Sequence, residues 1–281
     1  MNKKLKIAFQ GDVGAYSHIV SLELFPNAEI KACATFEETF QFAKENPEHK
    51  IVIPIENSLA GRVADIHYLI PKYKLQIHAE YFQKVNHNLL GLKGSKIEDI
   101  KTVRSHSQAI GQCQKIILEN KLKPIISADT AGSAKFVAEQ RDKKESAIAS
   151  TLAAKIYGLE ILKKNIEDDD KNVTRFLVMG KESKHPEFKE KKYITSCIFK
   201  LKSVPAALYK ALGGFATNGV NLCKLESFAV KNTFDQVNFY IDIEGHIENS
   251  TVQKALEELG FHTEKLDILG VYEANSFRFN N

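Results

Sequence analysis

The chain has 281 residues, of which 43% are hydrophobic and 26% charged, and its formal net charge is +4. This composition fits a globular protein with room for two domains, and the interspersed charges form no basic stripe, so we expect no nucleic acid among its partners. No apolar run approaches the roughly 20 residues that span a bilayer, and the apolar segment at residues 5–9 is too short for a signal peptide. We therefore expect a cytoplasmic protein without a membrane partner.

The sequence also argues against a bound metal or organic cofactor. Its cysteines and histidines show no paired spacing that would suit zinc. Gly11 and Gly14 lack the third glycine of a dinucleotide-binding fingerprint. The scattered cysteines are expected to be reduced and buried thiols: Cys33, Cys113, Cys197 and Cys223.

The first 160 residues alternate short apolar strands with helical segments, which predicts a mostly parallel α/β sheet. A glycine turn at residues 11–15 follows the first strand, presents backbone N–H groups to an anion, and precedes a helix that Ser17 is expected to cap. The predicted strands cover residues 4–10, 51–55, 75–84 with a continuation of the same sheet at 86–92, 102–104, 124–127 and 146–149. The predicted helices cover residues 17–25, 61–70, 107–119, 130–141 and 152–157.

Polar turns follow three of these strands: Glu56-Asn57-Ser58, Ser105-His106 and Asp129-Thr130. Ligands of parallel α/β sheets lie at the carboxyl ends of the strands, so we expect the three turns to share one cleft. The alternative is that these residues cap the following helices. For Asp129 and Thr130 we favour capping over contact with a substrate.

The segment Thr174-Arg175-Phe176 places a hydroxyl beside a guanidinium at the start of an apolar strand. A bidentate cation next to a neutral donor suits an anionic substrate that must lose an oxygen. The alternative is a strand in which Arg175 forms an ordinary surface pair. The preceding acidic turn at residues 168–170 lacks the pattern of a calcium loop, so we interpret it as a solvated turn.

The C-terminal third has a different order of predicted strands and helices. A charged segment at residues 181–192 is expected to be a linker. The order of elements that follows is βαββαβ, which predicts a ferredoxin-like sandwich; Pro205 is expected near the first position of its first helix and Gly260 at the end of its second. The predicted strands cover residues 193–201, 222–230, 235–243 and 262–272, and the helices 205–217 and 250–259.

Six features in this order resemble the prephenate dehydratase family: residues 11–17, Glu56-Asn57-Ser58, Ser105-His106 through Gln112-Cys113, Asp129-Thr130-Ala131, Thr174-Arg175-Phe176, and a C-terminal domain of the ACT type. The resemblance implies a two-lobed, periplasmic-binding-like catalytic domain at residues 1–183 with its site between the lobes. It implies a regulatory ACT domain at residues 193–281. The implied activity is that of a monofunctional carbon–oxygen lyase, which converts prephenate to phenylpyruvate in phenylalanine biosynthesis without a cofactor.

The resemblance also implies roles for individual residues. Thr174 is expected to donate a hydrogen bond to the leaving oxygen, and Arg175 to anchor the pyruvyl carboxylate of prephenate. Glu56 would repel a dianionic substrate, so we expect it to orient neighbouring donors. The expected substrate-binding set is Asn57, Ser58, Ser105, His106, Gln112 and Thr130, with Phe176 as an apolar wall.

The ACT-type domain is expected to bind L-phenylalanine between subunits of a homodimer or homotetramer and to inhibit the enzyme. The implied positions are Ala207, Leu208, Asn221, Leu222, Glu226 and Ser227. Two departures from the family pattern, at Ala206 and at Phe228-Ala229, narrow the expected pocket and remove a charge from it. The alternative is a domain that serves dimerisation alone.

Two other functions fit the same sequence features. An arogenate dehydratase acts on a substrate with an amino group in place of the keto group of prephenate. A non-catalytic amino-acid-sensing protein has a two-lobed ligand site without turnover. The intact Thr174-Arg175 pair and the lack of a secretion signal argue against the second of these.

Overall fold

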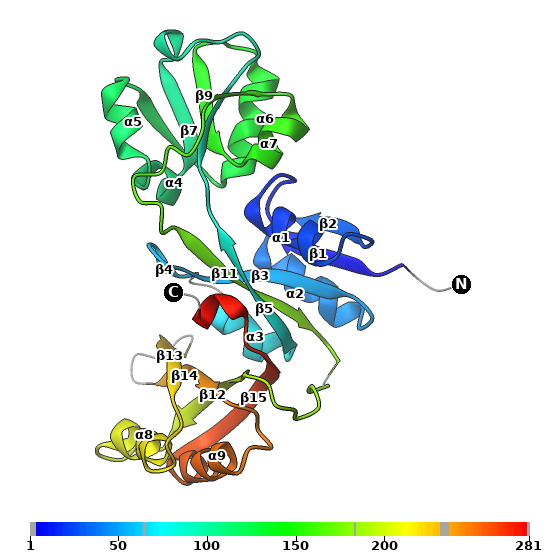
Figure 1. Ribbon diagram of the computed structural model, residues 1–281, viewed down its shortest axis with the longest axis vertical. Coiled ribbons are helices and arrows are strands. Elements are labelled where there is room, and N and C mark those ends of the chain that lie inside the picture. Colours follow the sequence, from blue (N-terminus) through cyan, green and yellow to red (C-terminus); the bar gives the residue numbers. More distant parts are fainter. Residues whose placement is uncertain (1–3, 64–65, 183, 231–235, 280–281) are drawn as a thin grey trace. The chain divides into compact units, whose positions relative to one another are not determined.

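The computed structural model describes residues 4–63, 66–182, 184–230 and 236–279, so Asp235, predicted to begin a strand, lies outside the described residues. The contacts divide the chain into two compact units. The first comprises residues 1–42, 49–63 and 81–176, and the second comprises residues 43–48, 64–80 and 177–281. Figure 1 shows their elements in chain order.

The first sheet has the strand order β2-β1-β3-β11-β5, with β4 paired to β3. β1 runs parallel to both β2 and β3, as predicted, whereas β4 is antiparallel to β3, so this sheet is mixed. The sequence analysis missed β2 and the helix α2 that follows it. The elements are β1 (Lys6–Gln10), α1 (Tyr16–Leu24), β2 (Glu29–Cys33), α2 (Phe36–Glu45), β3 (Lys50–Asn57), β4 (Gly61–Arg62), β5 (Gln76–Lys84) and β11 (Val173–Gly180).

Two local predictions in this region are wrong. Ser17 does not cap α1, because Ala15 occupies the N-cap position and Ser17 is buried inside the helix. The helix predicted over residues 61–70 begins only at Ile66, because Gly61 and Arg62 pair with Asn57 and Glu56 as an antiparallel hairpin. Asn57 therefore ends a strand that turns back on itself.

The second lobe is a five-stranded sheet with the order β10-β6-β9-β7-β8. β7 is parallel to β8 and β9, whereas β6 is antiparallel to β9 and β10. The prediction that residues 86–92 continue the sheet of β5 is wrong, because β6 belongs to this second sheet. The elements are β6 (Asn88–Gly91), η1 (Ile97–Asp99), β7 (Thr102–His106), α4 (Ser107–Gly111), α5 (Gln114–Glu119), β8 (Lys123–Ser127), α6 (Thr130–Gln140), β9 (Glu145–Ala149), α7 (Thr151–Tyr157) and β10 (Glu160–Lys163).

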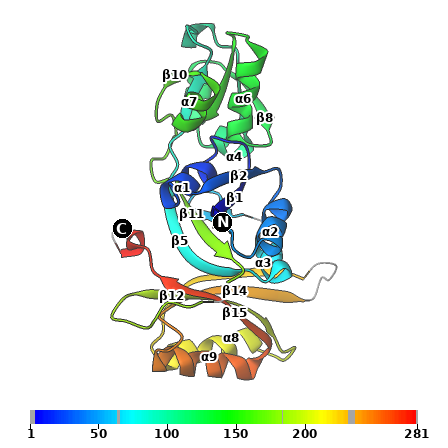
Figure 2. The same ribbon diagram turned by 90° about the vertical axis from the view of Figure 1, so that its right-hand side faces the viewer.

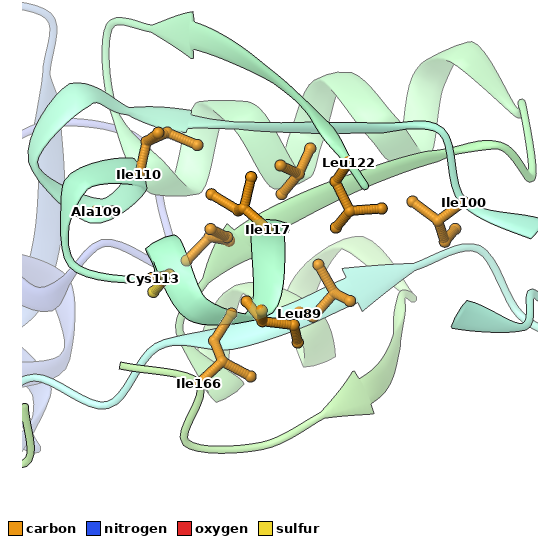
Figure 3. Packing of buried hydrophobic residues seen from close by; sticks show 11 residues of the cluster. Leu89, Ile100, Ala109, Ile110, Cys113, Ile117, Leu122 and Ile166 are labelled. Carbon is orange, nitrogen blue, oxygen red and sulfur yellow. The ribbon is translucent and has the colours of Figure 1, made fainter. Parts of the chain in front are cut away.

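Helices cover both faces of this second sheet. Leu89 (Figure 3) and Ile148 belong to a core shared with α4 and α5, whereas Leu90 and Ala147 belong to a core shared with α6 and α7. This alternation follows from the period of two along a strand. The single helix predicted over residues 107–119 is in fact two helices, α4 and α5, which meet at Gln112 and Cys113.

The chain passes between the first sheet and the second lobe twice, at residues 85–87 and at residues 164–172. The two crossings are hydrogen-bonded to each other, since Val85 N donates to Asn172 O at 2.8 Å and Ile166 N donates to His87 O at 2.8 Å. The glycine turn forms a third contact, in which Ser150 Oγ donates to Gly14 O at 2.6 Å. The turn that the sequence analysis interpreted as an anion cradle thus contacts the N-terminus of α7.

The second unit contains a four-stranded antiparallel sheet with the order β13-β14-β12-β15, which confirms the ferredoxin-like prediction. Figure 2 shows α8 and α9 on one face of this sheet. α9 continues through Gly260, so its predicted end is wrong, whereas Pro205 lies two residues before α8, near its first position as predicted. The elements are β12 (Tyr193–Leu201), α8 (Ala207–Thr217), β13 (Leu222–Ala229), β14 (Val237–Glu244), α9 (Ser250–His262), β15 (Thr263–Glu273) and η2 (Ser276–Phe279).

The other face of this sheet contacts α3 (Ile66–Tyr73), which belongs to the same unit. The ring of His67 lies 5.2 Å from that of Tyr240 and 5.6 Å from that of Phe228. Residues from the first quarter of the chain therefore complete the core of the C-terminal unit. None of the helices among the described residues has the length and hydropathy needed to cross a bilayer.

Candidate active site

Asn57 holds the hydroxyl of Thr174 in a defined orientation. The side-chain oxygen of Asn57 accepts hydrogen bonds from the backbone N–H groups of Leu59 (3.0 Å) and Ala60 (2.9 Å), which are turn residues of the hairpin. Its amide nitrogen must then face β11, where Nδ2 donates to Thr174 Oγ1 at 2.9 Å. Because Thr174 Oγ1 accepts this bond, its own hydrogen is left to donate to another group.

A chain of amides extends from Asn57 to the second lobe. Asn57 Nδ2 also donates to Asn172 Oδ1 at 2.7 Å, and Asn172 Nδ2 donates to Gln112 Oε1 at 2.8 Å. His87 Nε2 lies 3.0 Å from the same Gln112 oxygen. Asn172 is fully buried and His87 is 3% exposed. The prediction named Asn57 and Gln112 but gave no role to Asn172, which connects them, or to His87, which binds Gln112 at the end of the chain.

Arg175 is paired with Glu56. Its Nη1 lies 3.0 Å from Glu56 Oε1, and its side chain is 2% exposed against 30% for that of Glu56. Successive side chains of a strand point to opposite faces, and the pairs Glu56–Arg175 and Asn57–Thr174 follow this rule on neighbouring strands. The guanidinium therefore lies on the face of the first sheet opposite the Thr174 hydroxyl, and the expectation that both meet one substrate finds no support in this geometry.

Two predicted serines use their hydroxyl groups on the backbone. Ser58 Oγ donates to Lys171 O at 2.7 Å and accepts from Val173 N at 2.9 Å, so it joins the β3 turn to the start of β11. Ser105 is fully buried and donates to Ile148 O at 2.7 Å inside the second sheet. Both contacts are structural, and we leave Ser105 out of the proposed substrate set.

The remaining predicted residues lie at helix starts or in the core. His106 is the N-cap of α4, because its Nδ1 accepts from Gln108 N at 3.3 Å, and neither Ser105 nor Ser107 fills that position. Asp129 caps α6 through Gly132 N at 2.6 Å, and Thr130 is the first residue of that helix. Phe176 is 1% exposed and packs in the core, so it offers little surface to a substrate.

Burial shifts the titration of three groups close to the amide chain. It lowers the pKa of His87, which is therefore neutral near pH 7. It raises the pKa of the Cys113 thiol far above the usual range, so this cysteine is no nucleophile. It also raises the pKa of Tyr16, whose hydroxyl donates to Asn86 O at 2.5 Å.

Asp168 shows that the acidic turn is not simply solvated. Its carboxylate accepts from Gln114 N at 2.8 Å and from Lys115 N at 3.2 Å, which caps α5 from a distant part of the chain. Over the part of the chain that the structure describes, no three His, Cys, Asp or Glu side chains form a group that could hold a metal. The four cysteines form no disulfide, and Cys33, Cys113 and Cys197 are buried.

The predicted effector positions lie in two places of the ferredoxin-like sheet and its helices. Ala207 and Leu208 begin α8, and Asn221 directly precedes β13. Leu222, Glu226 and Ser227 belong to β13, which is an edge strand. An edge strand offers unpaired backbone groups to a neighbouring chain.

The family model described as prephenate dehydratase matches residues 7–184. A bifunctional N-acyl-homoserine lactone acylase/prephenate dehydratase from Komagataeibacter europaeus is 42% identical over 278 residues, which cover 99% of each chain. The chloroplastic arogenate dehydratase/prephenate dehydratase 1 of Arabidopsis thaliana is 39% identical, over 99% of this chain and 74% of that protein. The crystal structure of prephenate dehydratase from Arthrobacter aurescens in complex with L-Phe has a TM-score of 0.88 and 27% identity, over 96% of this chain and 90% of that one.

Proposed function

Because the chain belongs to the prephenate dehydratase family, we propose that it converts prephenate to phenylpyruvate, carbon dioxide and water without a metal or organic cofactor. The observation that carries the proposal is the hydrogen bond from Asn57 Nδ2 to Thr174 Oγ1. It leaves one neutral donor, the Thr174 hydroxyl, available for a leaving oxygen.

The chemistry needs a donor of this kind. The bond from the ring to its carboxylate breaks, its electron pair enters the ring, and the bond from the ring to the hydroxyl oxygen breaks. Negative charge therefore develops on the departing oxygen, and a donor that meets this charge lowers the barrier. Since a threonine hydroxyl is too weak an acid to give up its proton, we assign it a hydrogen bond; water or His106 supplies the proton that completes the leaving water.

The substrate set is Asn57, Gln112, His106 and Thr130, with Thr174 at the reacting centre; Ser58 serves this set by positioning, because its hydroxyl is engaged by the backbone of Lys171 and Val173. Gln112 contributes its amide nitrogen, because its oxygen is engaged by Asn172 and His87. Arg175 and Glu56 then act by positioning: their ion pair joins β11 to the end of β3 directly beside Thr174 and Asn57. This assignment replaces a direct contact of Arg175 with the substrate.

Turnover of purified substrates tests the proposal. We expect the wild-type protein to release phenylpyruvate from prephenate and Thr174→Ser to retain much of that activity. Arogenate, assayed in parallel, distinguishes an arogenate dehydratase, an activity named for the Arabidopsis relative. Wild-type protein that turns over neither substrate would contradict the proposed function.

One relative favours a second activity. The Komagataeibacter protein, which is named for both acylase and dehydratase activities, covers 99% of this chain. We therefore include hydrolysis of N-acyl-homoserine lactones as a second candidate, measured by the appearance of homoserine lactone. If Thr174→Ala abolishes both activities, they share one site; if cleavage of the N-acyl amide bond survives, it uses other residues.

We further propose that residues 1–183 form the catalytic domain and residues 193–281 an ACT domain that binds L-phenylalanine in a homodimer or homotetramer. The ferredoxin-like topology, the exposed edge of β13 and the L-Phe complex of the Arthrobacter protein support this. Truncation after Lys192 would strip α3 of its partners in the second unit, so a point variant is the better test. We expect Glu226→Ala to weaken both phenylalanine binding in calorimetry and inhibition of turnover.

A further inference from the structure

We propose that His87 is a positioning residue of this site: its Nε2–H group holds the side-chain oxygen of Gln112, so that the Gln112 amide nitrogen faces the substrate. The proposal rests on the dehydratase function proposed above. It assigns a task to a buried histidine in the crossing between β5 and β6, which the sequence analysis did not single out.

The direction of every hydrogen bond in the amide chain follows from its first member. Backbone N–H groups can only donate, so the Asn57 atom that they contact must be the oxygen. The nitrogen of Asn57 then faces Asn172, which must present its own oxygen at 2.7 Å. Asn172 consequently turns its nitrogen toward Gln112 at 2.8 Å, and the Gln112 atom there must be the oxygen.

This direction determines the tautomer of His87. An amide oxygen only accepts, so His87 Nε2, at 3.0 Å from Gln112 Oε1, must carry the hydrogen. The opposite tautomer would place two lone pairs against each other. With its oxygen held by two donors, Gln112 keeps its amide nitrogen for another acceptor, and among the described residues no protein atom accepts a hydrogen bond from it.

This arrangement leaves the other ring nitrogen of His87 without a hydrogen bond in the part of the chain that the structure describes. His87 Nδ1 is buried and has no hydrogen-bond partner among the described residues. With the hydrogen on Nε2, Nδ1 can only accept, and the described groups around the ring offer it no donor: the ring of Tyr16 lies 6.1 Å away and its hydroxyl donates to Asn86 O, while Glu167 accepts from the backbone N of His87 at 2.9 Å. An apolar residue would avoid this unsatisfied nitrogen, so the histidine is explained by what Nε2 does.

A double-mutant cycle separates positioning from mere structure. His87→Leu removes the donor, whereas His87→Gln carries an amide N–H that can reach the place of Nε2. We expect His87→Leu to lower kcat/KM about tenfold, as for the loss of one buried hydrogen bond, and to change kcat and KM in the same proportion as Gln112→Leu. We expect His87→Gln to recover most of the loss, and His87→Leu to add little in the Gln112→Leu background.

His246→Leu is the matched control, because this histidine is 1% exposed in the second unit; it should reduce stability without changing kcat/KM. Additive losses in the cycle, or equal losses for His87→Leu and His87→Gln, would overturn the proposal. A second measurement needs no substrate and no variant: nitrogen-15 NMR of the imidazole in the wild-type protein. A hydrogen on Nε2 supports the proposal and a hydrogen on Nδ1 refutes it, even if the wild-type protein dehydrates neither prephenate nor arogenate.

Discussion

Each unit of the molecule buries a polar network, and the two networks are made of different chemistry. The first unit uses neutral amides: Asn57, Asn172 and Gln112 form a hydrogen-bonded series in which each side chain fixes the orientation of the next. The second unit uses charges. Arg278 Nε and Nη2 bind both oxygens of Glu80 at 2.6 and 2.8 Å, and the Glu80 side chain is fully buried.

The charged network continues into the ferredoxin-like sheet. Ser196 donates to the fully buried carboxylate of Asp242 at 2.5 Å and lies 2.8 Å from the hydroxyl of Tyr272. A buried charge that loses its partner destabilises the fold, so removing any member of this network should lower the stability of the protein. An amide carries a donor and an acceptor without a net charge, so it can set an orientation at a smaller desolvation cost. The comparison predicts losses of stability in the second unit and losses of turnover in the first.

Arg278→Ala should give the largest effect. It removes the bidentate cation from the Glu80 carboxylate, and breaking a buried pair costs about 3–5 kcal/mol of unfolding free energy, measured by urea denaturation. Lys191→Ala is the control, because its pair with Glu273 is about half exposed and such pairs contribute about 1 kcal/mol or less. Equal losses for the two variants would contradict this view of the second network.

Thr174→Ala tests the first network through kinetics. Loss of a donor to a developing charge typically costs about a hundredfold to a thousandfold in kcat. We expect this loss in steady-state assays with prephenate, little change in KM, and an unfolding free energy close to that of the wild type. A rise in KM with kcat intact would show that the hydroxyl binds the ground state instead.

A pair of serine variants sharpens the comparison at single hydrogen bonds. Ser196→Ala removes one donor from the Asp242 carboxylate, and bonds to charged groups contribute about 1.5–3 kcal/mol. Ser105→Ala removes a bond to the neutral carbonyl of Ile148, which contributes about 0.5–1.5 kcal/mol. Thermal unfolding should rank the two in this order, and Ser105→Ala should keep nearly all of its turnover. A large drop in kcat for Ser105→Ala would return this residue to the substrate set.

The smallest expected effect is a dependence of stability on pH. The lowered pKa of His87 means that the unfolded chain binds a proton more readily than the folded protein. The stability that neutral His87 contributes is therefore complete above about pH 6.5 and is lost as the pH falls toward the lowered pKa, by at most about 1.4 kcal/mol per unit. The pKa values of His18 and His185 are lowered too. The contribution of His87 is therefore measured as the difference between wild type and His87→Gln in how the unfolding free energy changes with pH. Equal changes in the two proteins would contradict the prediction.

Most of the fold was predictable because turns and periodicity mark it clearly. β12 matches its predicted bounds, and α6 begins at Thr130, directly after the predicted capping residue Asp129. β2 was missed because it is short and only Cys33 of its side chains is buried, so that the alternation of Ile30 and Ala32 with charged residues gave a weak signal. The hairpin after β3 was missed because an asparagine such as Asn57 can either cap a helix or close a turn. Only the pairing of Gly61 and Arg62 with Asn57 and Glu56 decides between the two.

The site was predictable in its residue types and less so in its contacts. The Asn57–Thr174 bond joins residues 117 positions apart, so no local pattern reveals it. The burial of Ser105 could have been found, because Ser105 is in phase with the buried Val103 along β7. The same alternation of side chains along a strand places Thr174 and Arg175 on opposite faces of the sheet. His87 has no such signal: its role depends on the Gln112 oxygen, whose direction is set in another part of the fold.

The place of β11 in the first sheet has a consequence for synthesis on the ribosome. β11 lies between β3 and β5, yet it follows the whole second lobe in the chain. Until it emerges, β3 and β5 carry unpaired edges that can associate with other chains. The second lobe, in contrast, is continuous from β6 to β10 and depends on more local contacts. The middle of the nascent chain is thus able to fold before its beginning, and β3 and β5 lack their common neighbour β11 until the second lobe has been synthesised.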